Sequence, residues 1–596
     1  MQFSFTSQKL ALIFIVLAGF LVHSPMLGSD FKTVDDYVSI NYNHAIRDLH
    51  NVPQFFKESF FKTSNDYYRP LILTTFALNY AAHGLNAFFF NLTDLILHLI
   101  CALLVYFLIL RIVKDQNIAF LSGLLFAIHP VQWDAVGNIA GRSIILCALF
   151  YFAAMLFYMR RQWWLCAAAF FLSLLSKESA STFLLVVIGY EFIYGRKKEN
   201  SEPVQKIFIR LAILCAVFGV YILLRKNAGI VTPLVLPGVE EWVVRVLTFF
   251  RGMWDYLRLM FFPYDLHYDR SMPYLKPVLS FNLLAALLFI VVSVGAMFKY
   301  FGKATSAVRF LVIWLICDFL LYSQIVIPIG TSAGYAMLSE HFLYLPLASA
   351  LPLLIIGVKY LGVWLIRQDI CSKIFLKSLA VFFVIHLALI TVYQEWSFSD
   401  NISMLRRSLE FNDKNSRVHI AMGLSYVYKN RFVEAEKEFR RALELQPRDE
   451  RARIALGTAL CGQGKYWEGL EFFEQVQYPG DLEELLRANV RNTYVKLVDI
   501  YQKKIKANSN DAAAHYSLGV AFSKLEKYND AIKEFEITLS LKPDHEQALF
   551  NLGSVLGLKG DTKKAFDYYR QYLVKYPSGE FVKQIEMTLN DTNVNR

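Results

Sequence analysis

The stretch FFFNLTDLILHLICALLVYFLIL, residues 88–110, decides the fold of the first part of the chain. It runs for 23 residues with one acidic side chain and one histidine, and it contains no lysine, arginine, glycine or proline. A helix rises about 1.5 Å per residue, so about 20 apolar residues cross the hydrocarbon core of a bilayer. The stretch therefore predicts a membrane-spanning helix.

Apolar stretches of similar character lie on both sides of this one, and together they predict about eleven spans. We expect them at residues 10–28, 88–110, 117–129, 143–158, 162–175, 180–194, 206–224, 281–298, 307–327, 343–364 and 374–393. The composition agrees, because 55% of the residues are hydrophobic and only 19% are charged. After residue 395 no stretch is long enough to cross a bilayer. We therefore predict a membrane domain over residues 1–395 and a second domain over residues 396–596.

The basic residues predict the direction of the spans. Lys and Arg gather in the cytoplasmic loops of membrane proteins, which accounts for the net charge of +11 without nucleic acid. With the N-terminus in the cytoplasm, nearly every basic cluster falls in a cytoplasmic loop. The clusters are Arg111 with Lys114, Arg160 with Arg161, Arg196–Lys198 with Lys206, Lys299 with Lys303, and Arg367 with Lys373. An odd number of spans then places residues 396–596 on the extracytoplasmic side of a multi-pass cell (inner) membrane.

Two long loops lie on the outer side in this topology, at about residues 28–88 and 225–280. The second contains residues 242–262, in which arginines alternate with aromatic and aliphatic residues. Such a segment is too charged to span a bilayer, and we expect it to lie along the membrane surface. The polar chemistry is therefore concentrated at one face of the membrane.

A period of 34 residues organises the C-terminal part of the chain. Gly423 and Gly457 are 34 residues apart, and so are Gly519 and Gly553. This period, with small residues where paired helices touch, is typical of tetratricopeptide repeats. A solenoid of such repeats presents a concave face to peptides or partner proteins.

The best-fitting repeats are residues 421–447 and 517–543. Between them the period fails, and we expect residues 481–507 to form a degenerate repeat with a long helix. The fold class is therefore all-α: a polytopic membrane bundle followed by a tetratricopeptide-repeat solenoid.

Two adjacent carboxylates, Asp35 and Asp36, open the first outer loop just past the first span. Adjacent carboxylates repel each other and are rarely needed for solubility alone. Either is a candidate general base that takes the proton from an acceptor hydroxyl. Alternatively, the pair holds a divalent cation against a phosphate through oxygen ligands, or only caps a solvated helix.

Ionisable residues also stand in the other outer loops, close to the bilayer. Arg69, in Tyr68-Arg69-Pro70, either binds a lipid phosphate as a bidentate fork or anchors the loop at the interface. Lys177 and Glu178 either form an ion pair or leave Lys177 to face an anionic headgroup. The remaining candidates in these loops are His129, Asp134, Arg142, Glu340 and His341. Charged groups at a membrane interface are costly, which makes the set a candidate site.

The sequence does not favour other kinds of chemistry. The seven cysteines form no C-x-x-C pair, and most lie in apolar segments. The sequence has no P-loop, G-x-G-x-x-G, nucleophile-elbow or H-E-x-x-H motif. Within the spans, Asp94 and His98 lie one helical turn apart, and we expect them to pair with each other.

The order of these motifs resembles that of a known family. Five motifs precede the repeats: Asp35-Asp36, Tyr68-Arg69-Pro70, His129-Pro130 with Gly141-Arg142, Lys177-Glu178, and Glu340-His341-Phe342-Leu343-Tyr344-Leu345-Pro346. The ordered set is similar to the transmembrane-and-tetratricopeptide-repeat (TMTC-type) O-mannosyltransferases and their prokaryotic relatives, over nearly the whole chain. His341 stands where the related pattern commonly has Arg.

This resemblance implies a GT-C-type membrane fold whose first outer loop carries the catalytic carboxylate. It implies a polyprenyl- or dolichyl-phosphate sugar as donor, usually mannose, and a Ser or Thr hydroxyl as acceptor. The repeat domain then either holds the acceptor protein or peptide, recruits another partner, or only serves as an anchor. In the inverting displacement that we expect, Asp36 or Asp35 deprotonates the acceptor hydroxyl. Cations such as Arg69, Arg142 or Lys177 stabilise the leaving phosphate. The metal requirement stays open, and a divalent cation at the two carboxylates is the candidate cofactor.

Three other functions also stay open on the sequence. A non-catalytic scaffold would use the spans to anchor a repeat platform, although one helix would be enough for anchoring. A transporter or flippase would contain inverted repeats with broken helices, and we see no internal symmetry between the two sets of spans. A third alternative keeps the sugar transfer and changes the acceptor to a glycan or lipid.

Overall fold

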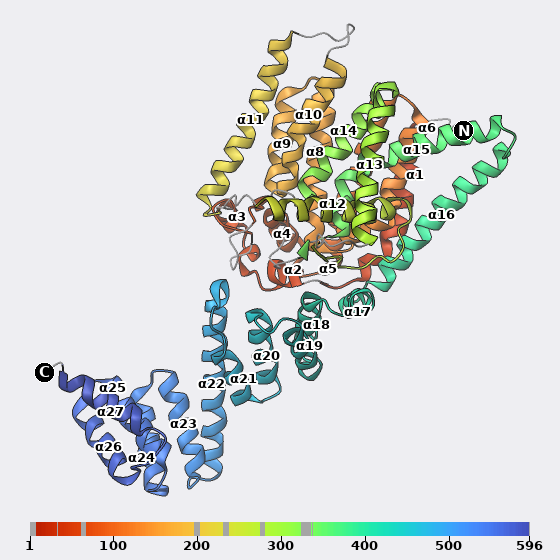
Figure 1. Cartoon of the computed structure of the whole chain (residues 1–596). Helices are drawn as coiled ribbons and strands as arrows, with labels where there is room; N and C mark the ends of the chain where they lie inside the picture. The colour runs from red at the N-terminus through yellow and green to blue at the C-terminus, as the bar shows by residue number, and fades with distance from the viewer. Residues whose placement is uncertain are drawn as a thin grey trace. The chain divides into compact units, whose positions relative to one another are not determined.

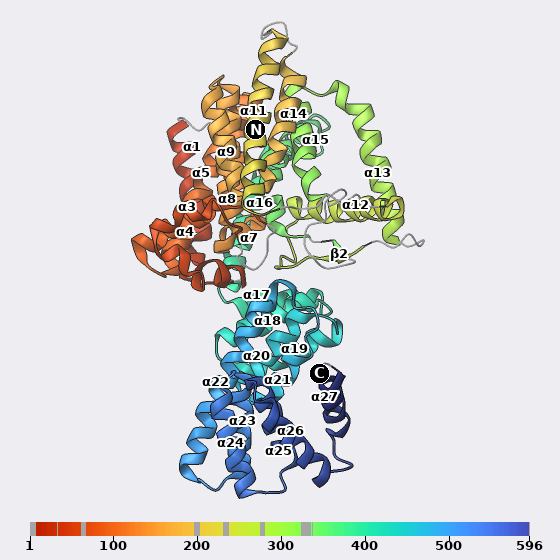
Figure 2. The same ribbon diagram turned by 90° about the vertical axis from the view of Figure 1, so that its left-hand side faces the viewer.

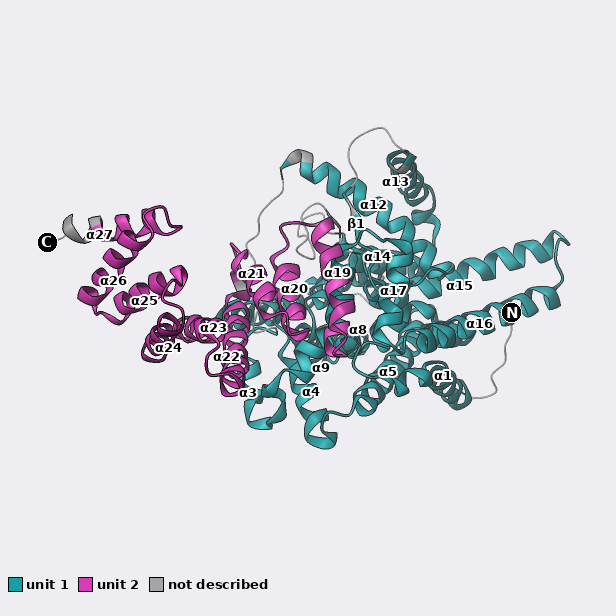
Figure 3. Cartoon of the chain, turned by 90° about the horizontal axis from the view of Figure 1, so that it is seen from below, with its two compact units in different colours: residues 1–425 teal, residues 426–596 magenta. Residues whose placement is uncertain are grey.

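The computed structural model describes residues 8–32, 34–60, 67–195, 203–230, 238–274, 281–323, 335–336 and 338–594. The chain divides into two compact units, residues 1–425 and residues 426–596 (Figure 3). The first unit contains the long apolar helices, and the second contains most of the repeat helices. The predicted domain boundary after residue 395 lies near the C-terminal end of α16 (Lys373–Ser397), and we keep it as a proposal for the limit of the membrane domain.

Helices occupy every segment in which the apolar pattern predicts a span. They are α1 (Gln8–His23), α5 (Ala87–Val113), α6 (Gln116–Ile128), α8 (Arg142–Met159), α9 (Trp163–Ser176), α10 (Phe183–Tyr190), α11 (Val204–Asn227), α13 (Phe281–Tyr300), α14 (Ser306–Tyr322), α15 (Tyr344–Arg367) and α16. Successive helices run in alternate directions, so their connections lie at two opposite ends of the bundle (Figure 1).

Seven of these helices are long and apolar enough to cross a bilayer on their own: α1, α5, α8, α11, α13, α15 and α16. An eighth crossing results if α6 counts together with the segment Pro130–Val136, which bends away from it by 46°. The three others are shorter, with 14 residues in α9, 8 in α10 and 17 in α14. The chain is therefore a multi-pass membrane protein whose bundle combines full-length and shorter apolar helices.

Short elements fill the loops at the end of the bundle that follows α1. They are η1 (Ser24–Gly28), α2 (Val34–Asp36), η2 (Tyr37–Asn41), η3 (His44–Arg47), η4 (Leu49–Asn51), α3 (Val52–Phe55), α4 (Pro70–His83), η5 (Pro130–Gln132), α7 (Trp133–Val136), η6 (Ile139–Gly141), η7 (Glu178–Thr182) and η11 (Glu340–Leu343). Two more, η8 (Glu191–Gly195) and η10 (Phe301–Lys303), lie at the opposite end. The two-residue strands β1 (Met272–Pro273) and β2 (Tyr335–Ala336) pair antiparallel.

The amphipathic helix α12 (Val239–Phe261) lies across the same end of the bundle as α4 (Figure 2). It forms where the sequence predicts a charged segment along the membrane surface. Trp242, Val243 and Trp254 are exposed on it, while Tyr256 is buried against the bundle. The helix therefore packs one side against the bundle and exposes apolar side chains on another side.

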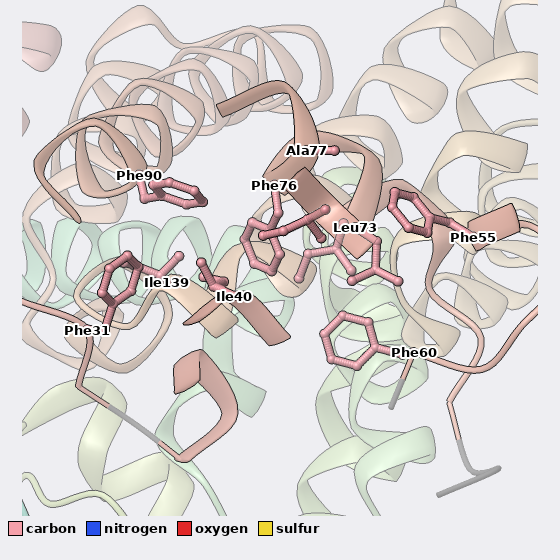
Figure 4. Packing of buried hydrophobic residues seen from close by; sticks show 11 residues of the cluster. Phe31, Ile40, Phe55, Phe60, Leu73, Phe76, Ala77, Phe90 and Ile139 are labelled. Atoms are coloured by element: carbon pink, nitrogen blue, oxygen red, sulfur yellow. The ribbon is translucent and has the colours of Figure 1, made fainter. Parts of the chain in front are cut away.

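A buried apolar cluster fixes the first loop to the bundle (Figure 4). Phe31 and Ile40 lie on either side of the adjacent carboxylates in sequence and are at most 6% exposed. They pack with Phe76 of α4, Phe90 of α5 and Ile139 of the second loop. Burial of such side chains stabilises the loop by about 1.5–3 kcal/mol each. The position of the carboxylates is thus set by a core.

Paired helices form the repeats. They are α17 (Asn401–Phe411), α18 (Ser416–Tyr428), α19 (Phe432–Leu445), α20 (Glu450–Gly462), α21 (Tyr466–Glu474), η12 (Gly480–Leu482), α22 (Glu483–Ala507), α23 (Ala512–Lys524), α24 (Tyr528–Leu541), α25 (Glu546–Lys559), α26 (Thr562–Lys575) and α27 (Val582–Val594). The 25 residues of α22 confirm the long helix expected over residues 481–507.

The glycines of the 34-residue period lie where paired helices touch. A β-carbon on Gly519 would lie 2.7 Å from the ring of Phe535, and one on Gly553 would lie 2.8 Å from the ring of Tyr569. Each ring follows its glycine by 16 residues, on the second helix of the pair. The period therefore marks a close helix–helix contact, as predicted.

We expect Gly519→Ala to destabilise the repeat domain by about 1–3 kcal/mol, because the added methyl group overlaps a fully buried ring. Hydrogen–deuterium exchange of the full chain measures the effect as faster exchange in α23 and α24. Gly557→Ala is the matched control, since its β-carbon would lie 3.8 Å from Ala565 in ordinary contact. Higher helix propensity should then slow exchange in α25. Equal exchange in the two variants would contradict the packing argument.

Candidate active site at one end of the membrane bundle

Asp36 ties the first loop to the second. Its side chain is fully buried. The carboxylate accepts hydrogen bonds from the backbone N–H of Lys32 at 2.9 Å and from the backbone N–H of Ala140 at 2.7 Å, one to each oxygen. A carboxylate held in this way positions backbone and is poorly placed to meet a substrate.

Asp35, by contrast, is exposed. Enough protein surrounds its carboxylate for burial to raise its pKa, and the charge of Asp36 raises it further. The charges of Arg69 and Arg417 act in the opposite direction. The arrangement gives an accessible carboxylate with a raised pKa, which suits a general base.

Arg69, the residue before α4, faces Glu178 of the third loop. Its Nε and Nη2 atoms donate to the Glu178 carboxylate at 3.2 and 2.9 Å. The guanidinium also lies over the ring of Tyr67, 4.3 Å from its centroid. Burial opposes ionisation of Glu178, yet Arg69 keeps the pKa of that carboxyl below its usual value. The pair joins the first loop to the third.

Lys177, in the third loop, makes no hydrogen bond to a carboxylate among the described residues. It is 8% exposed, and its amine lies 6.0 Å from the centroid of the Phe342 ring. In the described part of the chain, no hydrogen-bond acceptor pairs with this amine. Burial and the nearby charge of Arg69 lower the pKa of Lys177 to about 8. The alternative in which Lys177 faces an anion is therefore favoured over the Lys177–Glu178 ion pair.

His341 and Asp134 join the fifth loop to the second. His341 Nδ1 lies 2.8 Å from Asp134 Oδ2, which also accepts from the His341 backbone N–H at 3.0 Å and from the Ser339 hydroxyl at 2.9 Å. Asp134 is 3% exposed, whereas the His341 side chain is 24% exposed. The carboxylate thus orients an accessible imidazole. Burial lowers the pKa of His341, and the charges of Lys177 and Arg69 act in the same direction.

Glu340 and His129 hold the loops in place. Glu340 is fully buried and accepts hydrogen bonds from Trp133 Nε1 at 2.5 Å and from Arg270 Nε at 2.7 Å. His129 is fully buried as well and donates from Nε2 to the Met260 carbonyl at 3.1 Å. Both side chains therefore fix α7, α12 and η11 relative to one another.

Arg142, at the start of α8, is fully buried. Its guanidinium donates to Asp94 of α5 and Asn79 of α4, both at 2.5 Å, and to the Phe90 carbonyl at 2.9 Å. These partners occupy the group, so we leave Arg142 out of the proposed phosphate site. The expected pairing of Asp94 with His98 is wrong, because Asp94 pairs with Arg142. The His98 ring instead lies 2.8 Å from the Tyr344 hydroxyl.

A second group of buried ionisable side chains, which the sequence did not predict, consists of His23, Lys32 and Glu395. His23 Nδ1 lies 2.7 Å from Glu395 Oε1, and both side chains are fully buried. Lys32 is 2% exposed, and burial lowers its pKa against the attraction of Glu395 and Asp36. The only sequence signal was the position of Lys32 and Glu395 at the two ends of the predicted membrane domain. The group connects the end of α16 to the loop that carries Asp35.

The five loops thus meet at one end of the bundle. Hydrogen bonds join the first loop to the second and third, the second to the fifth, and the fourth to the fifth. In the described residues, no group of three or more His, Cys, Asp or Glu side chains is placed to hold a metal ion. The cluster has an exposed carboxylate, an unpaired amine and an oriented imidazole, which is enough for proton transfer and anion binding.

The C-terminal part of the chain matches known repeat proteins. The model of the tetratricopeptide-repeat family matches residues 420–481 and 516–580. Among solved structures, the crystal structure of YrrB, a TPR protein, aligns with 31% of this chain and 97% of that one, at 20% identity and a TM-score of 0.17. The crystal structure of MamA aligns with 30% and 89%, at 19% identity and a TM-score of 0.14.

Curated relatives match more of the chain. The Caenorhabditis elegans protein O-mannosyl-transferase F38B6.6 is 25% identical over 72% of this chain and 61% of its own length. The human protein O-mannosyl-transferase TMTC3 is 22% identical over 89% and 68%. Human TMTC1 is 40% identical over 15% of this chain, but the match spans only 10% of that protein. The chain therefore spans a tenth of this last relative and less than two thirds of the Caenorhabditis elegans protein. Over most of its length, this chain is therefore similar to TMTC-type proteins named protein O-mannosyl-transferases.

Proposed function

We propose that this chain is a membrane glycosyltransferase that moves a sugar from a polyprenyl-phosphate donor to a Ser or Thr hydroxyl of an extracytoplasmic protein. The observation that carries the proposal is the exposed carboxylate of Asp35 within reach of the charge of Arg69, which also acts on the amine of Lys177, at one end of a membrane bundle. The relatives are named protein O-mannosyl-transferases, which supports mannose as the sugar and a protein as the acceptor.

In the proposed reaction, Asp35 takes the proton of the acceptor hydroxyl while the hydroxyl oxygen attacks the anomeric carbon of the sugar. The bond between that carbon and the phosphate oxygen breaks with inversion, and the lipid phosphate leaves with the electron pair. Lys177 neutralises the charge that develops on the phosphate, since its amine is not engaged by a carboxylate. His341, oriented by Asp134, supplies a second donor. Asp36 positions the loop that carries the base.

A lipid-linked donor suits a site in this position. The lipid tail of such a donor holds its phosphate at the membrane surface, next to the end of the bundle. We propose that this end and the repeat domain face the extracytoplasmic side of the cell (inner) membrane. Basic residues at the opposite helix ends, such as Arg111 of α5 and Arg367 of α15, support that orientation. Alkaline phosphatase fused after residue 400 should then be active.

The test is sugar transfer by the full chain in lipid nanodiscs supplied with polyprenyl-phosphate mannose and a peptide rich in Ser and Thr. We expect a mannosylated peptide with inverted anomeric configuration, and no product when a sugar nucleotide is the only donor. Product on a glycan or lipid instead of the peptide would change the acceptor. A folded chain that consumes no lipid-linked sugar would favour the scaffold.

The affinity for the donor should depend on pH through Lys177. The pKa of about 8 means that the amine is protonated below this pH and neutral above it. Attraction for the donor phosphate is therefore present at pH 7 and lost as the pH rises through 8. We expect the KM for polyprenyl-phosphate mannose to rise about tenfold between pH 7 and pH 9, in step with the loss of the protonated amine. Steady-state kinetics at saturating peptide measures this change.

Two variants at the same position control for other titrating groups. Lys177→Arg keeps a positive charge at both pH values, so its KM should stay flat. Lys177→Met should have a high KM at both. A rise of KM in Lys177→Met as steep as in the unchanged protein would assign the pH dependence to another residue.

A further inference from the structure

The segment between α12 and β1 lies against the fifth loop. The His267 backbone N–H donates to Glu340 Oε1 at 2.9 Å, and the Arg270 guanidinium donates to the same oxygen at 2.7 Å. The Arg270 backbone N–H also donates to the Leu338 carbonyl at 3.2 Å. One side of the segment is therefore fixed to a loop that carries the site residue His341.

The same segment also contacts α17, the first helix after the last apolar helix. The Tyr268 backbone N–H donates to the Ser408 hydroxyl at 3.0 Å. The His267 ring stacks on Phe411, with 4.5 Å between the ring centroids. Ser408 is 1% exposed, so this contact is an internal one within residues 1–425. Residue 268 is therefore held between α17 and the fifth loop.

The charge of Asp35 acts on two polar side chains of this region. Tyr268 and Arg417 of α18 are both half-buried. Burial raises the pKa of the Tyr268 phenol, and the charges of Asp35 and Asp134 add to the effect. Arg417 is close enough to Asp35 to oppose the rise of its pKa. Across the described ranges, neither the Tyr268 hydroxyl nor the Arg417 guanidinium has a hydrogen-bond or ion-pair partner.

We propose that Tyr268 and Arg417 bind the acceptor polypeptide and present its hydroxyl group to Asp35. A phenol and a guanidinium without partners offer donors that match the backbone carbonyls of an extended peptide. Arg417 lies in the chain after the last apolar helix, which is the side that an acceptor protein can approach. The donor phosphate, in the proposed function, is tethered at the bilayer and binds Lys177. The proposal rests on the proposed function and adds the acceptor side to it.

The experiment compares Tyr268→Phe and Arg417→Gln with the unchanged full chain in nanodiscs. The donor is polyprenyl-phosphate mannose, and the acceptor is a Ser/Thr-rich peptide. We expect the KM for the peptide to rise about tenfold in each variant, since each loses a hydrogen-bonding contact with the peptide. The KM for the donor should stay unchanged. Arg417→Lys should recover part of the peptide affinity.

Two neighbouring substitutions serve as controls. Tyr264→Phe removes a hydroxyl of the same segment that contacts His386, and Arg407→Gln removes an exposed ion pair with Glu410 on α17. Neither should change the peptide KM. An unchanged peptide KM in the Tyr268 and Arg417 variants, or a rise in the donor KM instead, would overturn the proposal.

The same variants separate this proposal from the proposed function. If the unchanged protein neither transfers nor hydrolyses the donor, the proposed function fails, and peptide binding is then measured alone by fluorescence anisotropy. Weaker binding in Tyr268→Phe and Arg417→Gln than in the two controls would still support a peptide site. Equal binding in all of them would refute it.

Discussion

Asp35→Asn is expected to lower the rate of sugar transfer by about 10²- to 10⁴-fold, the range that a positioned general base contributes. Asparagine keeps the size and polarity of the side chain but cannot accept the proton of the acceptor hydroxyl. Asp35 is exposed and has a raised pKa, so it is the carboxylate of the pair that an acceptor can reach. The measurement is kcat for peptide mannosylation with donor and peptide both saturating.

Asp36→Asn provides the matched comparison, because the Asp36 carboxylate holds the backbone of two loops together. Each of its oxygens accepts a backbone N–H, from Lys32 and from Ala140. An amide would turn an NH₂ toward one of these donors and leave it unsatisfied, at a cost of about 1–3 kcal/mol. Asp36→Asn should therefore unfold at a lower temperature, whereas Asp35→Asn should unfold like the unchanged protein. A stable but inactive Asp36→Asn beside an active Asp35→Asn would move the base to Asp36.

The helices could be predicted from the sequence because their signals are local. A run such as residues 88–110 is read without knowledge of any other part of the chain, and α5 covers it completely. The glycines at 519 and 553 were equally informative, since the close contact joins residues that are only 16 positions apart on consecutive helices. Helix length was less predictable. The loops take up part of several predicted spans, so α10 keeps only eight residues.

The partners of the candidate site residues could not be predicted in the same way. Arg69, Arg142 and Lys177 look alike in sequence, as single cations near the ends of apolar segments. Their difference depends on carboxylates that are distant in the chain, because Arg142 meets Asp94 from 48 residues away and Arg69 meets Glu178 from 109 residues away. Of these three cations, Lys177 alone makes no hydrogen bond to a carboxylate within the described residues.

Sequence neighbours were misleading for a related reason. Asp94 and His98 share a helix face, but the bundle offers each a better partner on another helix, Arg142 and Tyr344. Residues such as Tyr268 and Arg417 carry no motif at all. They come to Asp35 through the contact of α17 with the segment after α12, which no local pattern specifies.

Arg142→Met is expected to destabilise the membrane bundle by about 3–5 kcal/mol, because it leaves a buried carboxylate without its partner. Arg142 and Asp94 are both fully buried and lie 2.5 Å apart. The guanidinium also satisfies Asn79 and the Phe90 carbonyl, and it lies 4.8 Å from the centroid of the Phe76 ring. Its loss therefore loosens α4, α5 and α8 together. Unfolding by sodium dodecyl sulfate in mixed micelles, followed by circular dichroism, measures the change.

The double variant Asp94→Leu with Arg142→Met tests the cause of that loss. It removes both charges, so part of the stability should return relative to Arg142→Met alone, since the isolated charge is the larger cost. The donor KM of Arg142→Met, measured at a temperature where the variant stays folded, then separates structure from binding. A KM equal to that of the unchanged protein keeps Arg142 outside the phosphate site. Unchanged stability with a donor KM about tenfold higher would instead place the guanidinium on the donor phosphate. A tenfold change corresponds to about 1.4 kcal/mol of binding free energy. The buried ion pair would then not be the main role of Arg142.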